Sequence, residues 1–120
     1  MKYFPLDLDL WLRGEGSADS YLLREGNGRR MCCQGQRMLM LGVEAARLTG
    51  RKSVSAVDRG HVVTNLAIDS AAYNSNDCPI SMSDERRIAN INAALEEAGA
   101  DYRFAMPTPE HPAMIPYEAD

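Results

Sequence analysis

The chain has 120 residues, of which 45% are hydrophobic and 25% charged, with a formal net charge of −4. These values are typical of a globular protein of one domain, and they exclude a mostly disordered chain, a collagen-like repeat and a disulfide-rich scaffold. No apolar run reaches the roughly 18 residues that cross a bilayer, and aspartates interrupt the N-terminal segment where a signal peptide is apolar, so we expect a cytoplasmic protein without a membrane span.

The N-terminal third is predicted to contain a short helix and a β-hairpin. Over residues 4–13 leucines alternate with aspartates as in a strand, but Leu6 and Leu10 also keep helical spacing and a glycine follows, so we favour a short helix. Residues 21–23 and 31–33 are short apolar segments on either side of a Gly-Asn-Gly sequence, which tolerates the positive φ of tight turns. They therefore predict an antiparallel hairpin.

Two longer helices are predicted in the rest of the chain. Apolar residues recur at helical spacing over residues 34–48. The clearest helix spans residues 84–98, because Ser81 or Ser83 can cap its N-terminus, acidic residues occupy its first turn and Gly99 can end it. The remaining predictions are a strand or loop at 51–63, a short helix at 64–73, a turn at 74–77 and a terminal strand at 101–105.

Together these elements predict one α+β domain over residues 1–106, in which a small antiparallel sheet packs against two main helices. The sheet would combine the hairpin with the strand at 101–105, and the helices at 34–48 and 84–98 would cover it. Four prolines lie within residues 107–120, which we expect to form an extended Pro-rich tail.

The sequence contains no catalytic, cofactor-binding or metal-binding motif. Cys32 and Cys33 are an unusual pair, and a thiol at the start of a helix can become a nucleophile, but packing is the commoner role of a free cysteine. A zinc site needs a second ligand cluster, whereas His61, Cys78 and His111 are isolated from one another. We therefore predict a protein without enzymatic activity, cofactor or metal, in which the adjacent thiols are packing groups.

Charge is distributed unevenly along the chain. Residues 24–59 contain eight basic and three acidic side chains, whereas residues 60–120 contain three basic and ten acidic ones. The basic segment is rich in arginine, which binds carboxylates and phosphates through paired hydrogen bonds. These side chains either pair with the acidic half inside the fold or contact a partner. The candidate partner-binding residues are Arg29, Arg30, Arg37, Arg47, Arg51, Lys52 and Arg59.

Several short motifs follow one another along the chain: Trp11-Leu12-Arg13-Gly14, Tyr21-Leu22-Leu23-Arg24, Met31-Cys32-Cys33-Gln34-Gly35, Asn76-Asp77, the SDERR helix start and Asp101-Tyr102-Arg103-Phe104. Over residues 6–105 this order resembles a class of small phage and prophage proteins of unknown function, which share a Cys-Cys-Leu-Gly junction, an Asn-Asp turn and an acidic-capped final helix. This chain has Gln34 where that pattern has leucine, which argues against a buried role for position 34. The resemblance implies a mobile-element origin and a compact α+β fold, and it implies no activity.

In the absence of a catalytic motif, we expect a binding protein. The leading hypothesis is a non-enzymatic phage or prophage accessory protein that acts in the host cytoplasm, binds a host protein and thereby antagonises host defence, with exposed aromatic or methionine side chains at the centre of the contact. The alternative is a nucleic-acid-binding accessory protein that uses residues 24–59. Titration with nucleic acid at two salt concentrations separates the two, because phosphate contacts make affinity fall as salt rises.

Overall fold

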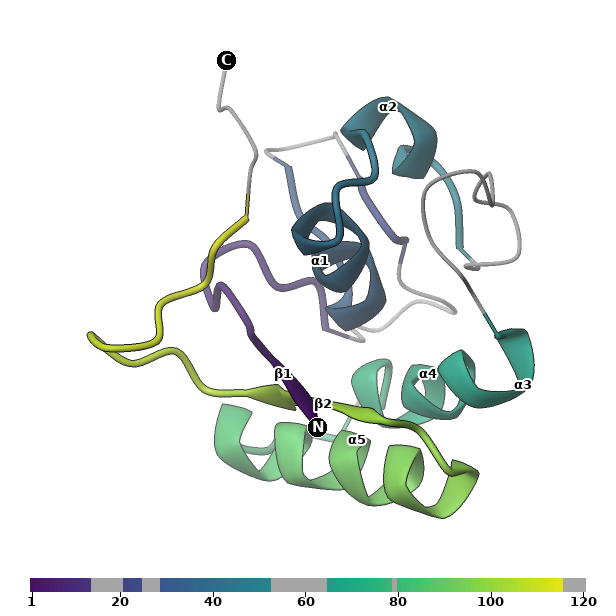
Figure 1. Cartoon of the computed structure of the whole chain (residues 1–120), viewed down its shortest axis with the longest axis vertical. Helices are drawn as coiled ribbons and strands as arrows, with labels where there is room; N and C mark the ends of the chain where they lie inside the picture. Colours follow the sequence, from purple (N-terminus) through teal and green to yellow (C-terminus); the bar gives the residue numbers. More distant parts are fainter. Residues whose placement is uncertain (14–20, 25–28, 53–64, 79, 116–120) are drawn as a thin grey trace.

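The computed structural model describes residues 1–13, 21–24, 29–52, 65–78 and 80–115, and the statements below concern these residues. In Figure 1 the two strands lie between α1 and α5, and α2 lies at the far end of the molecule from α5. Residues 53–64, which cover most of the segment predicted as a strand or loop, lie outside the described ranges. The elements in chain order are β1 (Lys2–Pro5), α1 (Cys33–Met40), α2 (Ala45–Leu48), α3 (Leu66–Asp69), α4 (Ala71–Asn76), α5 (Asp84–Ala98) and β2 (Tyr102–Ala105).

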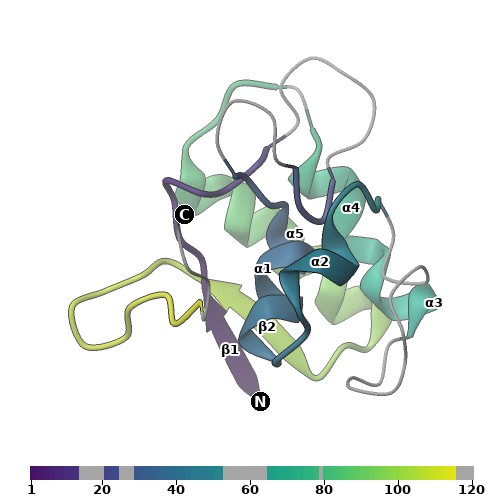
Figure 2. The same ribbon diagram turned by 90° about the horizontal axis from the view of Figure 1, so that it is seen from above.

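The sheet of the described residues consists of two parallel strands, β1 and β2, which lie side by side in Figure 2. Phe4 pairs with Phe104, so the first strand of the chain meets the last. The predicted antiparallel sheet is therefore wrong. A tight hairpin joins only antiparallel neighbours, whereas here most of the chain forms the crossover between two parallel strands. This pairing places the Phe4 ring 6.0 Å from that of Tyr102, edge to face, inside the core.

The helix predicted over residues 4–13 is also wrong. The chain is extended in β1, and beyond it the Asp7 carboxylate accepts hydrogen bonds from the N–H groups of Asp9 and Leu10 at 3.0 and 3.2 Å. This Asx turn satisfies the backbone in a way that competes with helix formation. Strand pairing with a distant segment therefore prevails over the helical spacing of the leucines.

The predicted hairpin is present in part: among the described residues, its two arms are joined by the pairing next to the turn and by a 3.1 Å hydrogen bond from the Cys32 N–H to the Tyr21 oxygen. Arg24 and Arg30 pair in antiparallel fashion, each N–H donating to the other residue's oxygen at 2.8 and 3.0 Å. Farther from the turn, Leu23 and Met31 each form a parallel bridge with another segment. The Gly-Asn-Gly turn itself lies outside the described residues.

The helix predicted over residues 34–48 is interrupted. Gly42 has a φ of 97° and ends α1, and the Val43 N–H donates to the Met38 oxygen at 3.0 Å. A glycine at positive φ after a helix redirects the chain, so α2 starts in a new direction. The predicted apolar stripe still points inward, because Met38 and Leu48 are fully buried.

The last helix and the last strand are confirmed. The Ser83 hydroxyl accepts a hydrogen bond from the Arg86 N–H at 3.2 Å at the start of α5, and Gly99 ends α5 with a φ of 84°. The short helix predicted at 64–73 is present as α3 and α4, and α4 extends into the turn predicted at 74–77. No helix in the described part of the chain combines the length and the apolar character that a bilayer crossing needs.

The apolar core has two parts that meet at α1. Cys33 belongs to the first part and Cys32 to the second, and both thiols are buried, which confirms their prediction as packing groups. The first part contains Phe4, Leu6, Trp11, Cys33, Ala72, Ile88, Ile91, Leu95, Ala100, Tyr102 and Phe104. The second contains Leu22, Leu23, Met31, Cys32, Met38, Leu39, Val43 and Leu48.

The segment after β2, predicted as an extended tail, folds back along the domain as far as it is described (Figure 1). Met106 packs against the first part of the core and Ile115 against the second. Between them, Thr108 and His111 exchange backbone hydrogen bonds of 3.1 Å each, which reverse the chain direction. This loop therefore forms one wall of the surface beside β1.

Candidate functional site

Several motifs of the sequence meet at one buried side chain, the amide of Asn76. Its Oδ1 accepts hydrogen bonds from the Trp11 indole N–H at 2.8 Å and from the Cys33 backbone N–H at 3.0 Å, and its Nδ2 donates to the Leu12 oxygen at 3.1 Å. The Cys33 N–H belongs to the first turn of α1, whose N–H groups have no partner within the helix. These motif residues therefore connect three segments of the fold, and their contacts explain them without a catalytic role.

Arg87, in the SDERR motif, is also buried and also structural. Its guanidinium donates to the backbone oxygens of Ser75, Asn76, Cys78 and Ile80 at 3.3, 3.1, 2.6 and 3.1 Å. The last carbonyl groups of a helix carry partial negative charge, so a cation at the end of α4 is stabilising. The same interaction fixes the chain between α4 and α5.

Arg37 lies in the core although it was a candidate for partner binding. The residue is 7% exposed, and its guanidinium carbon stacks 3.8 Å from the centre of the Tyr102 ring. Its Nη1 lies 3.6 Å from Asp69 Oδ1, which also accepts the Tyr102 hydroxyl proton at 2.6 Å. Burial raises the pKa of Tyr102 well above its ordinary value, so the phenol stays protonated.

Gln34 is completely buried, so the expectation that position 34 has no buried role was wrong. Its Nε2 donates to the Asp69 backbone oxygen at 3.0 Å and to the Tyr102 hydroxyl at 2.8 Å, while its Oε1 accepts from Arg37 at 3.1 Å. A glutamine is tolerated in the core because both ends of its amide are satisfied there. Gln34 therefore joins α1 to α3 and β2.

The candidate basic residues do not form one surface. Arg37 is in the core, Arg30 donates to the Trp11 oxygen at 3.2 Å, and Arg59 lies outside the described residues. The expectation that basic side chains interact with groups inside the fold therefore holds for Arg30 and Arg37. The others lie nearer the surface: Arg29 and Arg47 are half-buried and have partners, while Arg51 and Lys52 are exposed.

The thiols are not arranged for chemistry. Burial raises the pKa of Cys32 from 9.0 to about 12 and raises that of Cys33 well above the same ordinary value. Both therefore stay protonated and poorly nucleophilic at neutral pH. Within the ranges that the structure describes, no three metal-ligating side chains come together.

Side-chain amides cap both outer edges of the sheet. On β2, Asn92 of α5 accepts from the Phe104 N–H at 2.9 Å and donates to the Phe104 oxygen at 2.8 Å. Just beyond β1, Gln36 of α1 accepts from the Asp7 N–H at 2.7 Å and donates to the Asp7 oxygen at 3.0 Å. Each amide takes the place of a neighbouring strand residue and satisfies an edge that is otherwise open.

Among the described residues, no side-chain amide caps the β1 edge at Tyr3 and Pro5 in this way. In a parallel pair, alternate residues turn both N–H and C=O toward the partner strand. The Leu6 N–H donates to the Ala105 oxygen at 3.0 Å, so the even-numbered residues face β2 and Tyr3 and Pro5 turn their backbone groups outward. Tyr3 thus presents a donor and an acceptor, whereas Pro5 presents only an acceptor.

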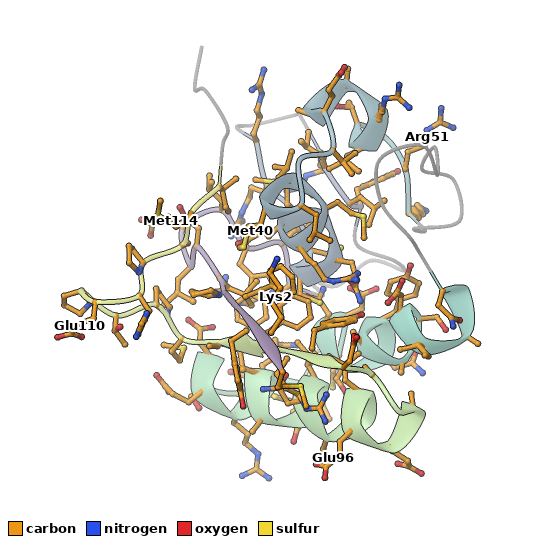
Figure 3. The ribbon with its side chains drawn as sticks, viewed as in Figure 1. Lys2, Met40, Arg51, Glu96, Glu110 and Met114 are labelled. Atoms are coloured by element: carbon orange, nitrogen blue, oxygen red, sulfur yellow. The ribbon has the colours of Figure 1, made fainter. Side chains whose placement is uncertain are left out.

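A groove of about 430 Å³ lies beside this edge. In Figure 3, Lys2 of β1, Met40 of α1 and Met114 of the returning loop follow one another across the view, while Arg51 lies away from them beside α2. Lys2 and Glu110 make no ion pair with another described residue. The lining is mostly apolar and consists of Lys2, Tyr3, Phe4, Pro5, Met40, Glu110, His111, Pro112 and Met114.

This groove was not predicted from the sequence. Its walls come from residues 2–5, Met40 and residues 110–114, which are brought together only when the first strand pairs with the last. The sequence contains one partial signal that the Pro-rich segment packs against the domain. Met114 and Ile115 are apolar, and an extended solvated tail does not need apolar side chains.

Comparison with known proteins gives no match. No protein-family model matches the chain, and neither a curated protein nor a solved structure does so.

Proposed function

We propose that the protein is a non-enzymatic binding protein of phage or prophage origin, and that it binds a host protein through the groove beside β1. The observation that carries the proposal is the combination of an apolar lining with outward-facing backbone groups at Tyr3. The origin, and with it the expectation that binding antagonises host defence, depends on the resemblance of the sequence motifs.

The exposed apolar side chains support the groove as the contact surface. Tyr3 is 61% exposed and Met114 is 72% exposed, and both line the groove. Tyrosine and methionine are enriched in protein interfaces, where a rigid ring and an adaptable thioether supply contact area. The charged groups of Lys2 and Glu110 can add orientation to such a contact.

Nucleic-acid binding remains the alternative proposal, and the exposed pair Arg51 and Lys52 supports it. Arg30 and Arg37 interact with groups inside the fold, which leaves fewer cations for phosphate contacts than the sequence suggested. A titration with labelled single- and double-stranded oligonucleotides at low and physiological salt tests it. Binding that weakens with salt and is lost in Arg51→Glu would favour the alternative over the groove.

Affinity capture from a bacterial lysate tests the groove directly when a matched variant is included. Met114→Lys places a charge in the groove, and Ile80→Lys places the same charge on a residue that is 65% exposed and does not line it. We expect one stoichiometric host protein to be captured by the wild type and by Ile80→Lys, but not by Met114→Lys. Capture that survives in Met114→Lys, or that both variants abolish, contradicts the proposal.

A further inference from the structure

We infer that the occupant of the groove is an extended segment of the partner protein, which adds to β1 as a third strand. This inference rests on the proposed function, because it specifies how the partner is held. Tyr3 turns both its N–H and its C=O away from β2 beside the groove, and Pro5, two residues later, turns its C=O the same way. An extended chain satisfies such groups with main-chain hydrogen bonds, as in other cases of strand addition.

The capped edges explain why the added strand must be at this place and must be short. Asn92 already satisfies the Phe104 edge of β2, and Gln36 already satisfies Asp7 beyond β1. Pro5 offers no N–H, so Tyr3 is the residue that can exchange two bonds with a partner strand. A helical partner would leave the Tyr3 groups unsatisfied, because its own backbone groups are bonded within the helix.

The residues that line the groove also indicate which types of side chain the partner's extended segment carries. Side chains of a strand alternate between its two faces, so one apolar side chain can enter the surface formed by Phe4, Met40 and Met114. The Lys2 ammonium lies 5.3 Å from the centre of the Phe4 ring and makes no ion pair with another described residue, so it favours an acidic residue at one end of the segment. Glu110, which lies well apart from Lys2 in Figure 3, disfavours an acidic residue at the other end.

Selection from a library of random linear ten-residue peptides, displayed on their mRNA, provides a probe that needs no known partner. Peptides are selected on the wild-type protein and counter-selected on Met114→Lys. We expect the enriched sequences to lack internal proline, to alternate apolar and polar residues, and to carry an acidic residue toward one end. Enrichment of helical or proline-rich sequences, or the absence of any enrichment that depends on Met114, overturns the inference.

A pair of variants at Tyr3 then tests the backbone contact. Tyr3→Pro removes the outward N–H, and Pro5 shows that proline at an outward position is compatible with pairing to β2. Tyr3→Val removes the same ring but keeps the N–H. We expect Tyr3→Pro to weaken binding of the selected peptides about tenfold relative to Tyr3→Val, as loss of one hydrogen bond implies.

A second readout keeps the inference testable if Tyr3→Pro does not fold. Methylation of single backbone nitrogens along a selected peptide should weaken binding at alternate positions only, because alternate N–H groups of an added strand face β1. Equal binding by both Tyr3 variants, or no alternation along the methylated peptides, overturns strand addition. The proposed function would still stand in that case, because it depends on the separate capture comparison of Met114→Lys with Ile80→Lys.

Discussion

Gly35 lies where the backbone of α1 passes against the backbone of Leu22, and a Cβ at this position would overlap the Leu22 carbonyl oxygen. Gly35→Ala should therefore cost about 3 kcal/mol of the free energy of unfolding, because neither backbone can move without disturbing the core. Gly42→Ala is the matched control: its Cβ would meet no atom within 4 Å, and only its φ of 97° is unfavourable, so about 1 kcal/mol is expected. Urea unfolding of both variants measures the difference. A smaller cost at Gly35 than at Gly42 would show that the two backbones are not in contact.

The three cysteines should differ sharply in reactivity. Cys32 and Cys33 are buried and Cys78 is partly exposed, so iodoacetamide should modify only Cys78 in the folded protein and all three after denaturation. Mass spectrometry of the intact chain counts the modified thiols. Rapid labelling of Cys32 or Cys33 in the folded state would contradict their role as packing groups and would reopen a nucleophilic function.

Burial of the Cys32 thiol also predicts a pH dependence of stability. The pKa of Cys32 is 9.0 when exposed and about 12 in the folded protein, so above pH 9 the unfolded chain binds fewer protons than the folded one. The free energy of unfolding therefore falls as the pH rises between these two values. Cys32→Ala should show a shallower fall between about pH 8 and about pH 10 than the wild type, measured by urea unfolding. An equal or steeper fall would contradict this assignment.

At the scale of elements, the ion pair of Arg37 and Asp69 joins α1 to α3. Asp69→Asn leaves the Arg37 cation buried without a carboxylate and should cost about 3 kcal/mol or more. The control is Asp84→Asn, which breaks the 2.8 Å pair with Arg13, whose side chains are 21% and 30% exposed. That change should cost less than about 1 kcal/mol, because solvent screens the pair. Calorimetry or urea unfolding compares them, and equal costs would mean that the Arg37 charge is accessible to water.

Boundaries that nearby residues set were predictable from the sequence, whereas the pairing of distant segments was not. The cap at Ser83 and the stop at Gly99 lie within a few residues of α5, so the sequence contains the whole signal for its ends. In contrast, β1 exists because β2 pairs with it from the other end of the chain. Gly42 is an intermediate case, because the apolar stripe continues past it and conceals the end of α1.

At the scale of the whole molecule, the candidate site was the least predictable part. Arginine in a basic segment indicates a cation, but only the fold shows that Arg37 faces Asp69 and Tyr102 rather than solvent. The groove likewise requires β1, the end of α1 and the returning loop to be in place at once. Motifs that suggested a family, such as Asn76-Asp77, contribute buried hydrogen bonds instead of an active surface.

Strand addition to β1 requires an open edge at Tyr3, and amide hydrogen exchange measured by NMR tests this edge in the free protein. The Phe104 N–H is bonded to Asn92 and the Asp7 N–H to Gln36, whereas the Tyr3 N–H points away from β2, and Tyr3 lines the groove. The Tyr3 amide should therefore exchange at least about 100-fold faster than that of Phe104, although both belong to the same sheet. Protection of Tyr3 equal to that of Phe104 would mean that the edge is already paired, and it would contradict the groove as a binding site.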